Sequence, residues 1–291
     1  MGKTVQSHVA VVTGASAGIG KAAARMLVER GWHVIGTGRD PGRSAAAEKE
    51  IAAAASPEAR FDLIRSDFDD MHDVARVADR IAALTDRVDV LINNAGGVRD
   101  KLYVTPDGYE ATFAANHLAP FLLTRSLLPL LRHAAGGSPP GAVRVIAVSS
   151  LAHERCPGMN WEDLNYREAF STNAAYCQAK LANILFTREL DRRLRDDGII
   201  AQVMHPGRVA SNFASHGDAG MQSYFAQADT DSPERAAQTL VWLATAPEAG
   251  RDGGRYFHDM AEVPLGANAR DDASARRLWS ESEALLARVG L

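Results

Sequence analysis

Cysteine is scarce in this chain and long apolar runs are absent. The 291 residues include two cysteines, Cys156 and Cys177, too few for a disulfide framework. No apolar run approaches the roughly 18 residues of a membrane span, and the N-terminal segment lacks the longer apolar core of a signal peptide. We therefore expect a cytoplasmic protein with free thiols and no membrane partner.

The chain also lacks a large excess of charge of either sign. The net charge of −4 gives no basic excess of the kind that nucleic-acid binders show, so we expect no nucleic-acid partner. The histidines and cysteines at 153, 156, 205 and 216 do not follow metal-ligand spacing, so we expect no metal. These absences leave a small molecule as the expected partner.

Short apolar runs alternate with helical patterns along the whole chain. We expect strands at 8–12, 33–37, 61–66, 88–93, 142–150, 199–207 and 254–259. We expect helices at 21–31, 44–55, 73–84, 173–198, 232–245 and 272–290, and one long helix or a pair of helices at 109–134. The strands are continuously apolar, which is typical of a parallel sheet covered on both faces. The pattern predicts an α/β, doubly wound Rossmann fold with a mostly parallel, seven-stranded sheet and helices on both faces, forming one domain over residues 1–291.

A glycine-rich turn, TGASAGIG at 13–20, joins the first strand to the first helix. Gly14, Gly18 and Gly20 would let the backbone turn tightly and approach a ligand closely. The helix start supplies free N–H groups and partial positive charge for a pyrophosphate. Glycine also suits an ordinary loop, but the position between strand and helix predicts dinucleotide binding.

The end of the second strand, GTGRD at 36–40, bears on the choice of coenzyme. An acidic residue here binds the ribose hydroxyls of NAD, whereas an arginine accommodates the 2′-phosphate of NADP. Arg39 favours NADP(H), and Arg43 would add a weaker contribution. Two alternatives stay open: Asp40 could bind the ribose instead, which would allow NAD(H), and Arg39 could be a solvated loop charge.

Tyr176 and Lys180 lie four residues apart in a predicted helix, NAAYCQAKLAN at 173–183. This spacing places the two side chains on one face. An ammonium beside a phenol lowers the pKa of the phenol, which suits an acid or base working near neutral pH. The pair alone could equally be two surface residues.

These motifs together resemble the short-chain dehydrogenases/reductases over nearly the whole chain. TGASAGIG, NNAG at 93–96, Asn116, VSS at 148–150, YCQAK at 176–180 and HPG at 205–207 occur in the order of that family. AAYCQAKLANILFTREL, VSSLAH and the late SPERAAQTLVWLATAPE resemble the branch of retinol dehydrogenase-like and WW-domain-oxidoreductase-like members. We expect neither a WW domain nor the membrane anchor that many retinol dehydrogenases have.

The resemblance implies catalytic roles for four residues. Tyr176 would give or take the proton, and Lys180 would lower its pKa and hydrogen-bond the nicotinamide ribose. Ser150 would hold the substrate oxygen, with Ser149 as the alternative. Asn116 would hold a water that links Lys180 to solvent, or else would be a buried, satisfied asparagine that kinks the helix near Pro120.

The resemblance also implies a set of coenzyme-binding residues. They are Gly14, Ser16, Ala17, Gly18, Ile19, Gly20, Arg39, Asp67, Phe68, Asn94, Ala95, Gly96, Tyr176, Lys180, Pro206, Gly207, Val209 and Ser211. Asp67 would contact the adenine or would simply cap a helix, and Asn94 would shape the coenzyme site or stabilise the sheet. Ser150 and Tyr176 are 26 positions apart, a longer interval than many members have.

The segments that follow the strands should border the substrate, because pockets in open α/β sheets lie past the carboxyl ends of the strands. Loops at about 98–105, 151–172 and 208–230 contain apolar and aromatic residues: Leu102, Tyr103, Met159, Trp161, Phe213, Met221, Tyr224 and Phe225. We expect an NADP(H)-dependent oxidoreductase that interconverts a moderately hydrophobic ketone or aldehyde and its alcohol.

Other readings of the same site stay open. An enzyme of this fold could reduce a C=C or C=N bond or act as an epimerase, and a protein of this fold could bind NADP(H) as a sensor without turnover. The long predicted helices at 109–134 and 173–198 could also pair between two copies of the chain, giving a homodimer.

Overall fold

An eight-stranded sheet forms the centre of the protein in this computed structural model, which describes residues 7–210 and 213–291. The strand order is β3-β2-β1-β4-β5-β6-β7-β8. The strands are β1 (Val9–Val12), β2 (His33–Gly38), β3 (Arg60–Arg65), β4 (Val90–Asn93), β5 (Val143–Val148), β6 (Ile199–Met204), β7 (Tyr256–His258) and β8 (Ala261–Glu262). Neighbouring strands pair in parallel as far as β7, which confirms the doubly wound α/β fold.

The predicted strand count of seven is wrong by one. β8 follows β7 after two residues, Asp259 and Met260, both with positive φ (50° and 62°), and pairs antiparallel with it. A two-residue strand after a tight turn carries no readable periodicity, which is why the sequence pattern missed it.

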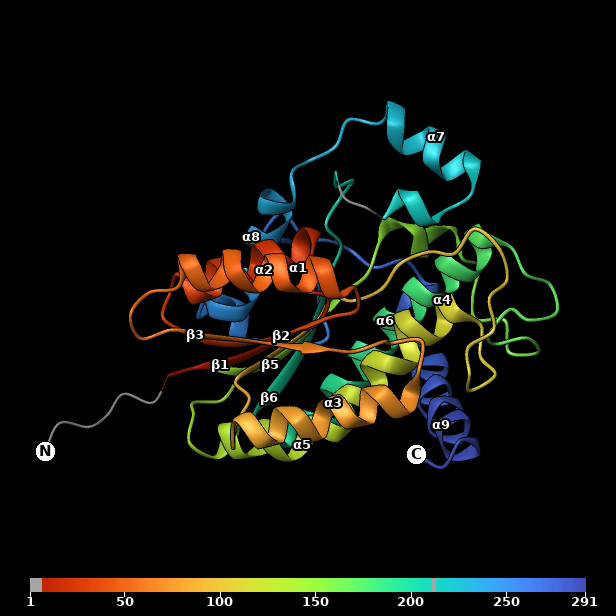
Figure 1. Cartoon of the computed structure of the whole chain (residues 1–291). Helices are drawn as coiled ribbons and strands as arrows, with labels where there is room; N and C mark the ends of the chain where they lie inside the picture. Colours follow the sequence, from red (N-terminus) through yellow and green to blue (C-terminus); the bar gives the residue numbers. More distant parts are fainter. Residues whose placement is uncertain (1–6, 211–212) are drawn as a thin grey trace, which may run out of the picture.

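Helices cover both faces of the sheet (Figure 1). One layer holds α1 (Gly18–Val28), α2 (Pro41–Ala54) and α8 (Pro233–Thr245), and the other holds α3 (Met71–Leu84), α5 (Ala119–Gly136), α6 (Thr172–Leu194) and the last helix α9 (Asp272–Arg288). Each layer buries its own apolar cluster against the sheet. Because both faces are covered, the strands are apolar on both sides, and β1, β4 and β5 are buried at every residue.

The segment 109–134, predicted as one long helix or a pair, is interrupted in the structure. It consists of the short α4 (Ala111–Phe113), a π-helical turn at Ala114–Leu118 and then α5. Pro120 lacks the N–H that would bond to the carbonyl of residue 116 in an α-helix, which fits a local loosening at this point. A further short helix, α7 (Ala219–Gln227), lies in the loop over 208–230, where the sequence pattern predicted none.

α9 packs along α6 and covers it. Arg193 lies over the Trp279 ring at 4.2 Å, and Trp279 stacks with Phe186 at a centroid distance of 6.0 Å. The residues of α6 classed as exposed are polar: Asn173, Arg192 and Arg193. α6 therefore keeps no apolar face for the expected pairing with a second copy, and the homodimer stays a prediction.

None of the helices in the described ranges is both long and apolar enough to cross a membrane.

The hydroxyl of Tyr109 ties α9 to the start of the α4 segment by donating to the carbonyl of Leu285. We expect Tyr109→Phe to lower the free energy of unfolding by about 1 kcal/mol, because a buried carbonyl loses its side-chain donor. Urea unfolding measures this. Tyr103→Phe, at an exposed position, is the matched control and should leave the unfolding midpoint unchanged; equal midpoints for both variants would contradict the assignment.

Candidate active site

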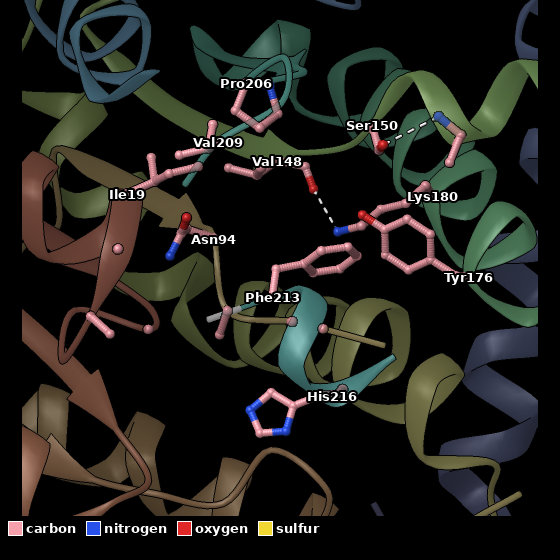
Figure 2. A pocket seen from close by; sticks show the side chains of 18 of the residues that line it. Ile19, Asn94, Val148, Ser150, Tyr176, Lys180, Pro206, Val209, Phe213 and His216 are labelled. Atoms are coloured by element: carbon pink, nitrogen blue, oxygen red, sulfur yellow. Dashed lines mark hydrogen bonds between the residues drawn. The ribbon is translucent and has the colours of Figure 1, made fainter. Parts of the chain in front are cut away.

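A cavity of about 790 Å³ opens at the carboxyl ends of the central strands. The strand order reverses between β1 and β4, which makes this edge the switch point where doubly wound folds bind ligands. Figure 2 shows Ile19 and Asn94 toward one side of the cavity and Ser150, Tyr176 and Lys180 toward the other. One space therefore joins the glycine-rich turn to the Ser, Tyr and Lys side chains.

The glycine-rich turn is packed so closely at Gly14 and Gly20 that a side chain has little or no room at either position. Gly14 has φ +72°, and a Cβ on Gly20 would lie 2.5 Å from the carbonyl oxygen of Gly14 and 2.5 Å from Asn94 Nδ2. Ala17 precedes α1 at the N-cap position, and its methyl side chain cannot accept a hydrogen bond from the N–H groups of the first turn. This cradle fits the pyrophosphate of a dinucleotide.

The turn is held to the neighbouring strand by hydrogen bonds to Thr13. Asn94 Nδ2 donates to the Thr13 carbonyl at 2.8 Å, and the backbone N–H groups of Asn94 and Ala95 donate to Thr13 Oγ1 at 2.9 Å. Asn94 therefore stabilises the sheet and shapes the cavity at once. Gly20 does not itself line the cavity, so it contributes by allowing the close packing.

No acidic side chain fits at the end of β2. A Cβ on Gly38 would lie 2.7 Å from Ser44 Oγ and 2.8 Å from Ser16 Cβ. Asp40 caps α2 by accepting from the N–H of Arg43 at 2.7 Å. One oxygen of its carboxylate is thus engaged as the cap, although Asp40 also lines the cavity.

Arg39 lies in the cavity wall within an acidic group. Its Nη1 is 3.1 Å from Asp69 Oδ2 and 3.6 Å from Asp67 Oδ1. Asp67 does not cap α3, because Asp70 does so; Asp67 instead accepts from the N–H of Asp69. The alternative that Asp67 is an ordinary helix cap is therefore wrong, and Arg39 is an ion-paired cavity residue.

Ser150, Tyr176 and Lys180 come together from β5 and α6. Ser150 directly follows Ser149 at the end of β5 and accepts from the N–H of Ala152 at 3.2 Å. Tyr176 and Lys180 are 8% and 5% exposed, and Lys180 Nζ lies 5.5 Å from the Tyr176 ring centroid. Ser149 Oγ instead donates to the carbonyl of Lys180 at 2.7 Å and stays buried, which favours Ser150 as the reactive hydroxyl.

The pKa of Tyr176 shifts in the direction opposite to the expected one. Burial raises the pKa of the Tyr176 phenol, and a hydrogen bond with Ser150 opposes this only in part. Lys180 Nζ donates to the carbonyl of Val148 at 3.1 Å (Figure 2), and burial lowers the pKa of Lys180 to about 8. The expectation of a phenol made acidic by Lys180 is thus wrong for the protein without coenzyme, because loss of hydration raises the pKa of Tyr176 by more than the hydrogen bond with Ser150 and the charge of Arg155 lower it.

Asn116 sits in the π-helical turn behind the cavity wall. Its Nδ2 donates to the carbonyls of Gly97 (2.7 Å) and Thr112 (2.8 Å), and its Oδ1 accepts from the N–H of Gly97 at 3.3 Å. A Cβ on Gly96 would lie 2.4 Å from that Oδ1. Asn116 is therefore a satisfied buried asparagine that braces the loop after β4, and its role toward a water stays a prediction.

Most of the other expected binding residues line the cavity. They are Ser16, Ala17, Gly18, Ile19, Phe68, Ala95, Gly96, Pro206, Gly207 and Val209. Ser211 lies outside the described residues. Phe213, Met221, Tyr224 and Phe225 line the substrate end, whereas Leu102, Met159 and Trp161 do not line the cavity.

Sequence reasoning missed several charged residues of the wall. Arg99 Nη2 pairs with both carboxylate oxygens of Asp69 at 2.8 and 2.9 Å, and Arg155 Nη2 donates to Asn173 Oδ1 at 3.2 Å. Glu154 and His216 also line the cavity. No spacing in the sequence marks them, because they come from loops that the fold brings together.

A dinucleotide-binding α/β fold with a Ser, Tyr and Lys cluster defines the class of this protein. The family model described as short chain dehydrogenase matches residues 8–221. The chain belongs to the short-chain dehydrogenase/reductase family and is an NAD(P)-dependent oxidoreductase acting on alcohol and carbonyl groups.

Relatives with known names agree with this assignment. The chain is 36% identical to human Retinol dehydrogenase 13 over 97% of its own length and 86% of that protein. It is 35% identical to the putative daunorubicin C-13 ketoreductase DnrU of Streptomyces sp. (strain C5), over 94% of its length and 91% of that protein. The solved Pseudomonas aeruginosa RhlG/NADP active-site complex superposes with a TM-score of 0.68 at 26% identity, covering 87% of this chain and 94% of that one.

The lowered pKa of Lys180 makes stability depend on pH. Between pH about 8 and 10.5 the unfolded chain keeps a lysine proton that the folded protein has lost, so this contribution raises the free energy of unfolding with pH. Without coenzyme, we expect Lys180→Met to be more stable than the wild type below pH 8, by at most about 3 kcal/mol. Urea unfolding of both proteins between pH about 8 and 10.5 measures the difference in their free energies of unfolding, which should vanish near pH 10.5.

The surface variant Lys21→Met, which removes an ion pair with Glu50, is the control for this experiment. Its stability difference should not change with pH between the same limits. A difference for Lys180→Met that is constant over the range would contradict the lowered pKa.

Proposed function

We propose that this protein is an NADP(H)-dependent reductase or dehydrogenase that interconverts a moderately hydrophobic ketone or aldehyde and its alcohol. The observation that carries the proposal is the single cavity that joins Arg39 and the glycine-rich turn to Ser150, Tyr176 and Lys180. A cavity of this size accommodates a coenzyme with a small reacting group beside it.

The preference for NADP(H) rests on the groups at the end of β2. Gly38 leaves no room for a carboxylate, Asp40 is engaged as a helix cap, and Arg39 faces the cavity. A guanidinium matches a phosphate in charge and geometry. Asp67 and Asp69 now pair with Arg39, so a 2′-phosphate would have to displace part of that ion pair.

Ser150 and Tyr176 would handle the substrate oxygen. When bound, the nicotinamide coenzyme supplies the hydride in reduction and accepts it in oxidation. In reduction, the carbonyl oxygen becomes negative and accepts hydrogen bonds from Ser150 Oγ and Tyr176 Oη, and Tyr176 then transfers its proton. The raised pKa of Tyr176 suits this order, because the phenol keeps its proton until the oxygen becomes strongly basic.

Lys180 would orient the coenzyme and add positive potential to the site. Its ammonium is buried beside Tyr176 and donates to the carbonyl of Val148. An ammonium has three donors, so two others would serve a ribose hydroxyl and the tyrosine oxygen. Asn116 is proposed to act through the loop at Gly97 that it braces.

The apolar lining of the substrate end supports a hydrophobic substrate. Phe213 lies 5.0 Å from the Tyr176 ring, centroid to centroid, and 5.7 Å from Phe225 (Figure 2 shows it beside Tyr176). Leu151 and Met221 extend this lining. The names of the relatives, a retinol dehydrogenase and a putative ketoreductase, agree with an apolar alcohol or ketone.

Two other functions stay open on the same site. Reduction of a C=C or C=N bond, or an epimerisation, would use the same coenzyme cradle and is distinguished by product analysis. A sensor without turnover would have no need for the intact Ser, Tyr and Lys group. The cytoplasmic location also stays a prediction.

Tyr176→Phe should abolish turnover while leaving coenzyme binding intact. Loss of the proton donor lowers kcat by about 100-fold or more. Coenzyme binding should be unchanged because the ring stays and only the hydroxyl is removed. We would follow NADPH oxidation at A340 over a panel of ketones and aldehydes and measure NADPH binding by energy transfer from tryptophan. Tyr109→Phe, which removes a buried tyrosine hydroxyl elsewhere, is the control; turnover by Tyr176→Phe at the wild-type rate would refute the role.

Arg39→Met should weaken NADPH binding selectively. Loss of a charged hydrogen bond to the 2′-phosphate raises the Kd for NADPH by roughly 10-fold or more and leaves the Kd for NADH nearly unchanged. Arg25→Met, which breaks a surface pair with Glu29, should change neither value. A wild type that prefers NADH would show instead that Asp40 sets the coenzyme.

A further inference from the structure

A buried aromatic and histidine cluster lies behind the catalytic serine. His153 is 0% exposed and Tyr256 is 1% exposed, and their rings meet edge to face at a centroid distance of 5.2 Å. Tyr256 also contacts the ring of His205 at 5.3 Å, and His205 stacks with His258 at 4.1 Å. The cluster joins the helical turn after Ser150 to β6 and β7, and no function discussed above uses it.

His153 reaches the backbone of Ser150 directly. Its Nδ1 lies 2.7 Å from the carbonyl oxygen of Ser150, which also accepts from the backbone N–H of His153 at 3.2 Å. A carbonyl oxygen can only accept, so Nδ1 carries the proton. In the neutral ring, Nε2 is then an acceptor. The side chain of Asn268 steadies the same turn by donating to the carbonyls of His153 (3.3 Å) and Cys156 (2.5 Å).

The cluster contains one unpaired acceptor and one unpaired donor. Within the described residues, neither His153 Nε2 nor the Tyr256 hydroxyl has a hydrogen-bond partner, although both atoms are buried. Buried polar groups without partners are rare and destabilising, and these two are chemically complementary. The Tyr256 hydroxyl also lies near enough to Tyr176 and Glu154 for their charges to raise its pKa, in addition to the larger effect of burial.

We propose that one internal water links Tyr256 and His153 by hydrogen bonds and that the linked pair positions Ser150 for the reaction. The chain runs from the Tyr256 hydroxyl through this water to His153 Nε2, and from His153 Nδ1 to the Ser150 carbonyl. Tyr256 and His153 are thus positioning residues, since neither touches the reacting atoms. This inference rests on the proposed function only in that Ser150 is the hydroxyl that holds the substrate oxygen.

The pairing orients Ser150 by fixing the backbone on which its hydroxyl sits. Ser150 Oγ accepts from the N–H of Ala152 in the same turn, so a rotation of the turn would move the hydroxyl away from Tyr176. A buried tyrosine anchored in β7 prevents that rotation, because β7 is hydrogen-bonded into the sheet beside β6. Small displacements of a positioned group cost rate rather than binding.

A double-mutant cycle tests the pair. Tyr256→Phe removes the donor, and His153→Asn keeps a donor near the Nδ1 position while deleting Nε2. We expect each single variant to lower kcat by about 5-fold with the coenzyme Kd unchanged, and the double variant to lower it no further, because the two groups act as a unit. His153→Leu, which also loses the bond to the Ser150 carbonyl, should lower kcat more than His153→Asn. Multiplied effects in the double variant would overturn the proposal.

The second measurement does not depend on turnover. In ¹⁵N NMR of the histidine-labelled protein, His153 should show a protonated Nδ1 and a hydrogen-bonded Nε2, and Tyr256→Phe should move the Nε2 resonance toward that of an unbonded ring nitrogen. Tyr109→Phe is the matched control and should leave both resonances and kcat unchanged. An Nε2 resonance that Tyr256→Phe does not move would overturn the pairing, whereas a wild type without carbonyl turnover would overturn the proposed function alone.

Discussion

The close packing of the β1–α1 turn against the end of β4 is the constraint on which the site depends. Thr13 receives hydrogen bonds from Asn94 and Ala95, and Gly20 has no side chain, so the turn lies directly on the neighbouring strand. The strand order reverses here, which opens a crevice with the start of α1 at its edge. The coenzyme cradle and the reactive side chains then face one space, because both lie at the carboxyl ends of neighbouring strands.

Burial gives the reactive groups their character. Tyr176 and Lys180 are both nearly inaccessible, so the phenol is held neutral and the ammonium loses its proton more readily than in water. Each shift opposes the charged form of its group, which means that the protein pays stability for a site prepared for a bound coenzyme. The hydrogen bonds at Ser150 also prepare the site. Ser150 Oγ accepts from the N–H of Ala152, and the Ser150 carbonyl accepts from His153, so both the hydroxyl and the backbone of Ser150 are held in place.

The sequence predicted the architecture of the fold and most of the residues that line the cavity. Period and composition located the first seven strands, and the order of TGASAGIG, NNAG, VSS and YCQAK identified the family that the comparison confirms. The prediction failed where a segment is too short to show a period, as in β8, and where segments distant in the chain meet, as in the cover of α6 by α9.

The sequence by itself determined which groups we propose for the chemistry, since a phosphate turn and a Tyr–Lys pair four residues apart are local patterns. Only the tertiary structure decided their electrostatic state and their neighbours. The raised pKa of Tyr176, the ion pairs of Arg39 with Asp67 and Asp69, and the contact of Tyr256 with His153 all arise between segments distant in the chain. Desolvation and pairing depend on everything that surrounds a group in space, and a linear pattern does not contain that information.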